Sequence, residues 1–162
     1  MVAIEPNIEI VRSLLNNLYM ARVKNVRVLP VAISNRDRFA ELFVSSNAIS
    51  LSLKREYVSA VGYKVRRVVK VPVLTLSSLL YFLEINKVDL LLLDVEGLSY
   101  EILTSSIELL KQGIFKRIKI DVSDYLYSRD FAGPLAIIAL LRKFNYKIFV
   151  TNFSLYAILQ SL

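Results

Sequence analysis

The sequence has 162 residues and contains neither cysteine nor histidine. Without cysteine the chain forms no disulfide, no thiolate nucleophile and no cysteine metal site. Without histidine it also lacks the usual general base and the commonest metal ligand, so we expect no metal site. Any acid–base chemistry must therefore be carried out by Asp, Glu, Lys or Tyr.

Glycine and long hydrophobic runs are scarce as well. The four glycines, at positions 62, 97, 113 and 133, are all far apart in sequence. The composition is 55% hydrophobic and the mean hydropathy is +0.49, yet no run approaches the roughly 18 to 20 apolar residues of a membrane helix. The first residues reach Glu5 and Pro6 too soon for a signal peptide. We therefore expect no transmembrane segment, a cytoplasmic location, and a single domain over residues 1–162.

Positive charge exceeds negative charge, with 21 Lys and Arg against 14 Asp and Glu, a net charge of +7. The basic residues concentrate at 54–55, 64–70 and 116–119. Such clusters could attract nucleic acid, and the alternative is a solvated surface. We favour the solvated surface and expect no nucleic-acid partner, because no recognition-helix or RNA-platform motif accompanies the charge.

Strand and helix patterns alternate along the chain. Residues 2–4 predict a short strand, and Asn7 is expected to cap a helix. The spacing of the apolar residues after Asn7 predicts that this helix extends to about Arg22. A second strand is predicted at 26–33, so this unit is typical of a parallel pair. Further strands are predicted at 39–44, 68–73, 117–122, 146–151 and 155–159, and helices at 75–84, 98–111 and 134–143. Together they indicate an α/β fold, with Pro72 favouring an edge position or a strand end.

The most informative stretch is residues 88–97, with the sequence VDLLLLDVEG. Its run of leucines predicts a strand that is covered on both faces. Asp94 and Glu96 follow where that strand ends, and Gly97 allows the turn into the next helix. Ligands of open parallel sheets bind outside the carboxyl ends of the strands, so the two acids are candidate functional groups. The alternative is that they only stabilise the start of a helix.

Seven short stretches, in order and at similar spacing, resemble FkbM-type methyltransferases. They are residues 2–7, 25–26, 31–34, 73–76, 88–89, 94–97 and 144–146, and they extend over nearly the whole chain. The resemblance implies a Rossmann-like class I methyltransferase sheet, mostly parallel with an antiparallel last strand. It also implies S-adenosylmethionine as cofactor and a hydroxyl-bearing small molecule or glycan as methyl acceptor.

The resemblance assigns roles to particular residues. Glu5, with Asn7 beside it, would hold the ribose hydroxyls of the cofactor, a role that suits a carboxylate because it can accept two hydrogens at once. Ile33 and Ser34 would lie beside the adenine. Asp94 and Glu96 would face the methyl donor and the acceptor hydroxyl, as the catalytic pair. The alternatives are that Glu5 stabilises its helix and that Ile33 is plain core.

The sequence also departs from the family pattern. The family has a first strand and a Gly-rich loop before the position of Glu5, and it has acids at the positions of Ser77, Ser78 and Ser99. We therefore expect an N-terminally truncated domain with weakened or lost activity, because only glycine lets backbone approach a cofactor so closely. Without that strand, two sheet edges would be exposed, so a homo-oligomer is expected. The alternative function is a non-catalytic remnant that acts as an oligomeric or partner-binding module.

Overall fold

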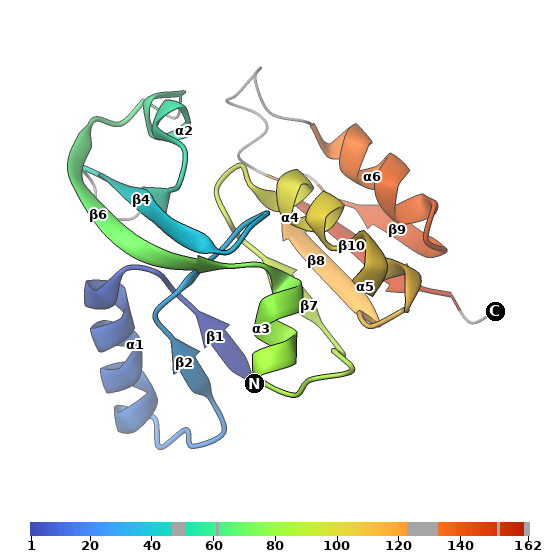
Figure 1. The fold of residues 1–162 in the computed structure, drawn as a ribbon, viewed down its shortest axis with the longest axis horizontal. Helices are drawn as coiled ribbons and strands as arrows, with labels where there is room; N and C mark the ends of the chain where they lie inside the picture. The colour runs from blue at the N-terminus through green and yellow to red at the C-terminus, as the bar shows by residue number, and fades with distance from the viewer. Residues whose placement is uncertain (47–50, 61, 123–132, 152, 161–162) are drawn as a thin grey trace.

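The computed structural model describes residues 1–46, 51–60, 62–122, 133–151 and 153–160, and Figure 1 shows the arrangement of its elements. The chain begins with strand β1 (Val2–Ile4), helix α1 (Ile8–Met20) and strand β2 (Arg27–Leu29). β1 and β2 form a two-stranded parallel sheet, with Ala3 opposite Val28. The predicted strand–helix–strand unit and its parallel pairing are confirmed.

The second sheet has the strand order β3-β6-β4-β5. Its strands are β3 (Ala32–Ile33), β4 (Arg38–Ser45), β5 (Leu51–Ser52) and β6 (Val65–Leu74), with helix α2 (Arg55–Ala60) between β5 and β6. The single strand predicted at 26–33 is wrong, because the chain leaves β2 at Pro30 and enters a different sheet at β3. Pro72 lies where β6 is paired by β4 alone, since β3 reaches only Val73 and Leu74. A residue without a backbone N–H is therefore tolerated there.

The third sheet has the strand order β7-β8-β10-β9. Helix α3 (Leu76–Phe82) precedes β7 (Leu91–Leu93), and helices α4 (Ser99–Ser105) and α5 (Ile107–Lys111) lead to β8 (Arg117–Asp121). Helix α6 (Pro134–Arg142), β9 (Tyr146–Val150) and β10 (Ser154–Leu159) complete the chain. β7 and β8 are parallel, whereas β10 is antiparallel to both of its neighbours. The antiparallel last strand is confirmed, but the prediction of a mostly parallel sheet is wrong: the sheets are mixed.

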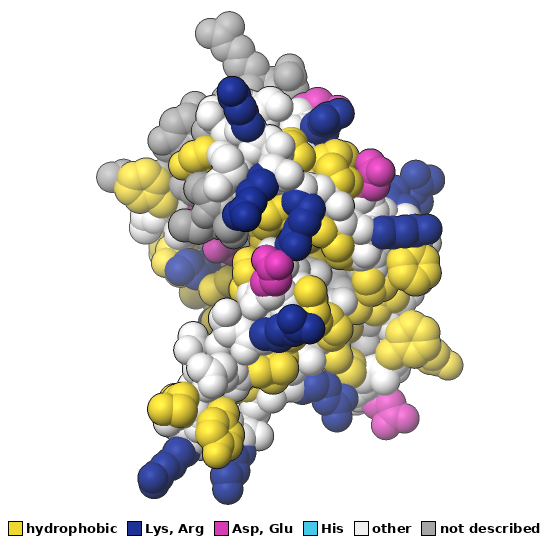
Figure 2. Space-filling model, turned by 90° about the vertical axis from the view of Figure 1, so that its left-hand side faces the viewer, with side chains coloured by type: hydrophobic (Ala, Val, Ile, Leu, Met, Phe, Trp, Pro, Cys, Tyr) yellow, Lys and Arg dark blue, Asp and Glu magenta, His cyan; other side chains and the backbone are white. Residues whose placement is uncertain are grey.

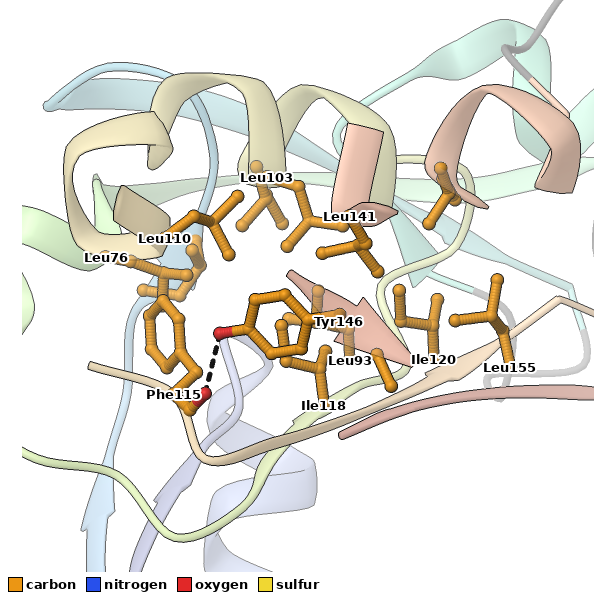
Figure 3. Close-up of a cluster of buried hydrophobic side chains, with 14 of the residues drawn as sticks. Leu76, Leu93, Leu103, Leu110, Phe115, Ile118, Ile120, Leu141, Tyr146 and Leu155 are labelled. Atoms are coloured by element: carbon orange, nitrogen blue, oxygen red, sulfur yellow. Dashed lines mark hydrogen bonds between the residues drawn. The ribbon is translucent and has the colours of Figure 1, made fainter. Parts of the chain in front are cut away.

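The main hydrophobic core lies between the third sheet and the helices above it, as Figure 3 shows. Ile118, Ile120 and Leu155 point from the strands toward Leu103 and Leu141 of the helices, and all five are at most 1% exposed. The buried Tyr146 hydroxyl donates a 2.6 Å hydrogen bond to the Phe115 carbonyl. Burial raises the pKa of Tyr146 to about 12, because the phenolate would lose its hydration.

In the described part of the chain, helices cover only one face of this third sheet. Leu93 is 3% exposed and belongs to the core, but Leu90 and Leu92 are 52% and 57% exposed. The prediction that residues 88–93 are covered on both faces is therefore wrong. Successive residues of a strand point to opposite faces, so the even-numbered leucines lie on the side without helices.

The helices α1 and α3 begin at residues whose side chains cap them, as the sequence predicts. Asn7 accepts a 3.0 Å hydrogen bond from the Glu9 amide and caps α1, and Thr75 accepts one of 3.1 Å from the Ser78 amide and caps α3. The helix predicted at 98–111 is instead two helices, because Ser106 leaves the helical conformation and its hydroxyl donates to the Ile102 carbonyl. Within the described residues, no helix has both the length and the apolar character needed to cross a bilayer.

Candidate functional site

The candidate residues follow the carboxyl ends of their strands. Glu5 follows β1, Ser34 follows β3, Asp94 follows β7, and Asp121 is the last residue of β8. In Figure 1, β1 and β7 both run toward the upper half of the view, so their carboxyl ends lie on the same side of the molecule. This edge is where ligands of open α/β sheets bind.

Glu5 is fixed in the turn between β1 and α1. Its amide donates to the Leu29 carbonyl at 3.1 Å, and its Oε1 accepts a 2.7 Å hydrogen bond from the Asn7 amide. Burial raises the pKa of Glu5, and the bond from Asn7 opposes that shift. A carboxylate accepts about four hydrogen bonds in total, so Glu5 retains the capacity to accept from a ligand. The Asn7 side chain is 5% exposed and caps α1.

Ile33 and Ser34 lie at the end of the short strand β3. Ile33 is 7% exposed and belongs to the main hydrophobic core. Ser34 is 1% exposed, its amide donates to the Leu74 carbonyl at 3.0 Å, and its hydroxyl donates to Asn35 Oδ1 at 3.4 Å. Both residues are rigidly held by pairing with β6. Their contact with an adenine ring stays a prediction.

Asp94 lies among charged neighbours at the ends of β7 and β8. Its pKa is raised, first by burial and then by the negative charge of Asp121, while Lys119 lowers it. The two carboxyl groups therefore interact electrostatically across adjacent strands, and Asp94 is suited to accept a proton. Asp121 was not among the candidates predicted from the sequence. It lies at the carboxyl end of a predicted strand, as Asp94 does, and that position could have identified it.

The backbone of the turn from Asp94 to Gly97 is strained, and a hydrogen bond from another segment holds it in place. Glu96 has φ of 48° and Gly97 has φ of 82°, so both are left-handed. For a residue other than glycine this conformation costs about 1–3 kcal/mol and persists only where the surroundings enforce it. Here the Ser52 hydroxyl of β5 donates to the Glu96 carbonyl at 3.1 Å. The second sheet therefore contacts the candidate catalytic turn.

An ion pair adds to the contact between these parts of the chain. Lys54, just after β5, pairs with Glu101 in the first turn of α4. Both side chains are partly exposed, so the pair contributes less than about 1 kcal/mol. Its importance is geometric, because it joins α4 to the segment that braces Glu96.

Ser78 and Ser99 occupy two of the positions at which the resemblance implies acids. Ser78 donates to Asp37 and also lies at the start of α3, where its amide donates to Thr75. The hydrogen bonds that the Asp37 carboxylate accepts from the Ser78 hydroxyl and from the Thr75 amide lower the pKa of Asp37. Ser99 is 3% exposed in the first turn of α4.

The basic stretch at 64–70 lies largely on β6. Figure 2 shows this side of the molecule, where Lys and Arg side chains lie between hydrophobic ones. Arg67 pairs with Glu9 of α1 at 2.9 Å, and the Lys70 ammonium lies 5.5 Å from the Phe39 ring centroid. Two shallow depressions of the described surface are not lined by Glu5, Asp94 or Glu96. One lies beside Phe39, and the other lies at the amino ends of β1 and β2.

Comparisons with known proteins find a matching family and a similar fold. The family model of the methyltransferase FkbM domain matches residues 1–148. The methyltransferase FkbM of Methylobacillus flagellatus KT has a similar fold, with a TM-score of 0.58 and 13% sequence identity. The match covers 96% of this chain but 36% of that protein, so this chain spans about a third of the length of its solved relative. A search of curated proteins finds no match.

Proposed function

Because the chain belongs to the FkbM methyltransferase family, we propose that it binds S-adenosylmethionine at the carboxyl edge of β1 and β7 and supports O-methylation weakly. The observation that carries the proposal is the raised pKa of both Glu5 and Asp94, each at the end of its strand. Perturbed acids at this edge of an α/β fold are typical of functional sites.

The residues fit the cofactor in part. Glu5 is held by the Asn7 amide in one orientation, which suits a carboxylate that accepts from two neighbouring ribose hydroxyls. Ile33 ends strand β3 and Ser34 follows it, and both would border the adenine. Against this, no two of the four glycines are close together, so no glycine loop of this chain lets backbone approach the cofactor. We therefore expect weak affinity and low activity.

The acids would handle the proton of the acceptor. S-adenosylmethionine, when bound, supplies a methyl group on a positively charged sulfur. Asp94 would orient the acceptor hydroxyl and accept its proton, which its raised pKa favours. Glu96, in the strained turn braced by Ser52, would contact the acceptor from the other side. The acceptor class is a hydroxyl-bearing small molecule or glycan.

Isothermal calorimetry with S-adenosylmethionine and S-adenosylhomocysteine tests the proposal. Glu5→Gln should weaken binding about tenfold, since a charged acceptor of hydrogen bonds is lost. Glu9→Gln is the matched control: Glu9 lies in the first turn of α1, but its carboxylate pairs with Arg67. Its affinity should equal that of the wild type. Absence of heat at millimolar ligand, or equal weakening by both variants, would contradict cofactor binding at Glu5.

A second candidate is a non-catalytic module that binds a partner or a second copy. It is favoured by β1 and β7, which are each the outermost strand of their sheet within the described chain. Edge strands present unpaired backbone groups that pair readily with another polypeptide. Light scattering at micromolar concentration checks the homo-oligomer form of this proposal: twice the monomer mass supports it, and the monomer mass refutes it.

A further inference from the structure

Two turns adjoin at the amino ends of the parallel strands. Residues 19–27 connect the end of α1 to β2, and residues 81–89 connect the end of α3 to β7. Both turns line one shallow depression, to which Lys24 and Ile85 contribute, so the turns lie side by side. In Figure 1 they lie at the lower end of the view, opposite the edge that holds the candidate acids. We call these two turns, together with residues 116–117 where β8 begins, the amino edge.

Large apolar side chains are exposed at the helix ends of the amino edge. Tyr19 is 80% and Met20 72% exposed at the end of α1, and Tyr81 is 82% and Phe82 69% exposed at the end of α3. The rings of Tyr81 and Phe82 form an edge-to-face pair with centroids 6.0 Å apart. Scattered single hydrophobic residues are ordinary on a protein surface, whereas exposed apolar residues that gather in one place mark interaction sites.

The amino edge is also rich in positive charge. Figure 2 shows Lys and Arg side chains beside hydrophobic ones at the lower end of the molecule. Within the described residues, the ion pairs found involve Lys54, Arg67 and Lys111, which all lie elsewhere. The cations of the edge therefore remain available to an anionic partner. All six are exposed: Arg22, Lys24, Arg27, Lys87, Lys116 and Arg117.

Acidic groups at the amino edge do not cancel this charge. The same turns contain two acids, Glu84 and Asp89, against the six cations. The Arg117 guanidinium lies beside Asp89, because its Nε donates a 3.2 Å hydrogen bond to the Asp89 carbonyl. The carbonyl ends of α1 and α3 add roughly half a negative charge each. Cations therefore remain in excess, and the edge attracts anions.

One kind of partner uses both the apolar and the charged groups of this edge. The phosphates of a nucleic acid would bind the cations but leave Met20 and Phe82 in water. An anionic bilayer offers lipid phosphates and carboxylates to the cations and an apolar interior to these side chains. Tyr19 and Tyr81 suit the boundary, because a tyrosine has an apolar ring and a polar hydroxyl and is enriched at the level of the lipid headgroups.

We propose that the amino edge docks on an anionic lipid bilayer. The four exposed apolar side chains enter the headgroup region, and the Lys and Arg side chains around them bind the anionic groups of the lipids. Docking in this way leaves Glu5 and Asp94, at the opposite edge, directed away from the membrane. It requires no cofactor, so it stands or falls separately from the proposed methyl transfer.

Sedimentation of the protein with vesicles, in the absence of cofactor, tests the proposal. Vesicles of phosphatidylcholine alone are compared with vesicles that also contain phosphatidylserine. The wild type should bind the phosphatidylserine vesicles at least about tenfold more tightly, since each cation adds attraction to an anionic surface, and high salt should weaken this binding.

Two double variants separate the contributions of charge and of apolar contact. Lys24→Glu with Arg27→Glu should reduce binding to phosphatidylserine vesicles at least about tenfold, because two cations are lost and two acids introduced. Tyr81→Ser with Phe82→Ser should also reduce it about tenfold, and should do so at high salt as well as at low salt, because salt does not screen apolar burial.

Phe39→Ser and Lys70→Glu are the matched controls. Phe39 is 66% exposed on the second sheet, and the Lys70 ammonium lies 5.5 Å from its ring centroid. Both controls should bind phosphatidylserine vesicles as the wild type does, and thermal melts should show all variants folded.

Three results would overturn the proposal. The first is that phosphatidylserine vesicles bind no better than phosphatidylcholine vesicles, and the second is that the controls lose as much binding as the variants of the amino edge. The third is that the protein binds duplex DNA but not vesicles, and that Lys24→Glu with Arg27→Glu abolishes the DNA binding, because the edge would then contact nucleic acid.

Discussion

Adjacent leucines of β7 should differ sharply in their contribution to stability. Leu93 is 3% exposed within the main core, whereas Leu92 is 57% exposed on the side of the third sheet that no described helix covers. Leu93→Ala should destabilise the fold by about 3 kcal/mol, from lost transfer energy and the cavity left behind. Leu92→Ala should cost less than about 1 kcal/mol, because less than half of that side chain is removed from water.

Urea unfolding followed by circular dichroism measures both costs, and thermal melts check them. In a chain of this size, 1 kcal/mol corresponds to about 2–4 °C. We therefore expect a fall in Tm of about 6–12 °C for Leu93→Ala and less than about 4 °C for Leu92→Ala. Equal destabilisation by the two variants would refute the one-sided burial of β7. A dependence of that equality on protein concentration would identify a second copy of the chain as the cover of Leu92.

Three further substitutions test other contacts. Tyr146→Phe should cost about 1–2 kcal/mol, because the 2.6 Å bond to the Phe115 carbonyl is lost; unchanged urea stability would contradict this. The pKa of Tyr146 in the folded protein is about 12, above its ordinary value of 10. The stability of the wild type should therefore fall as the pH rises from 10 to 12, and the stability deficit of Tyr146→Phe should become smaller. The raised pKa of Asp94 means that the folded state binds its proton more tightly, so wild-type stability should rise as pH falls through that pKa. Asp94→Asn should therefore be the more stable protein at pH 7 and lose this advantage in acid, whereas a pH-independent difference in Tm would refute the assigned cause. Thr75→Ala should cost about 1 kcal/mol through loss of the cap on α3, and a melt equal to that of the wild type would count against that cap.

Local signals predicted the elements well. Asn7 and Thr75 were identified as caps because their side chains satisfy amides at helix starts, which depends only on neighbouring residues. The strands predicted near 117–122, 146–151 and 155–159 correspond to β8, β9 and β10 for a similar reason, since alternation reports the two sides of a strand.

Long-range features were predicted less well. The leucine run at 88–93 carries no sign of which face is covered, because that depends on where helices from distant parts of the chain pack. The division of 26–33 into β2 and β3 depends on partners in two different sheets. In the candidate site, Asp94 was found from its strand, but Asp121 becomes its neighbour only through the pairing of β7 with β8.

The most direct test of the cofactor edge is an NMR titration of ¹⁵N-labelled protein with S-adenosylhomocysteine. We predict that the largest amide shifts occur at Glu5, Asn7, Ser34 and Val95, with small shifts at Phe39 and Lys70 on the second sheet. Saturating ligand without shifts at Glu5 and Ser34, or with the largest shifts on the second sheet, would contradict the assignment of this edge as the cofactor site.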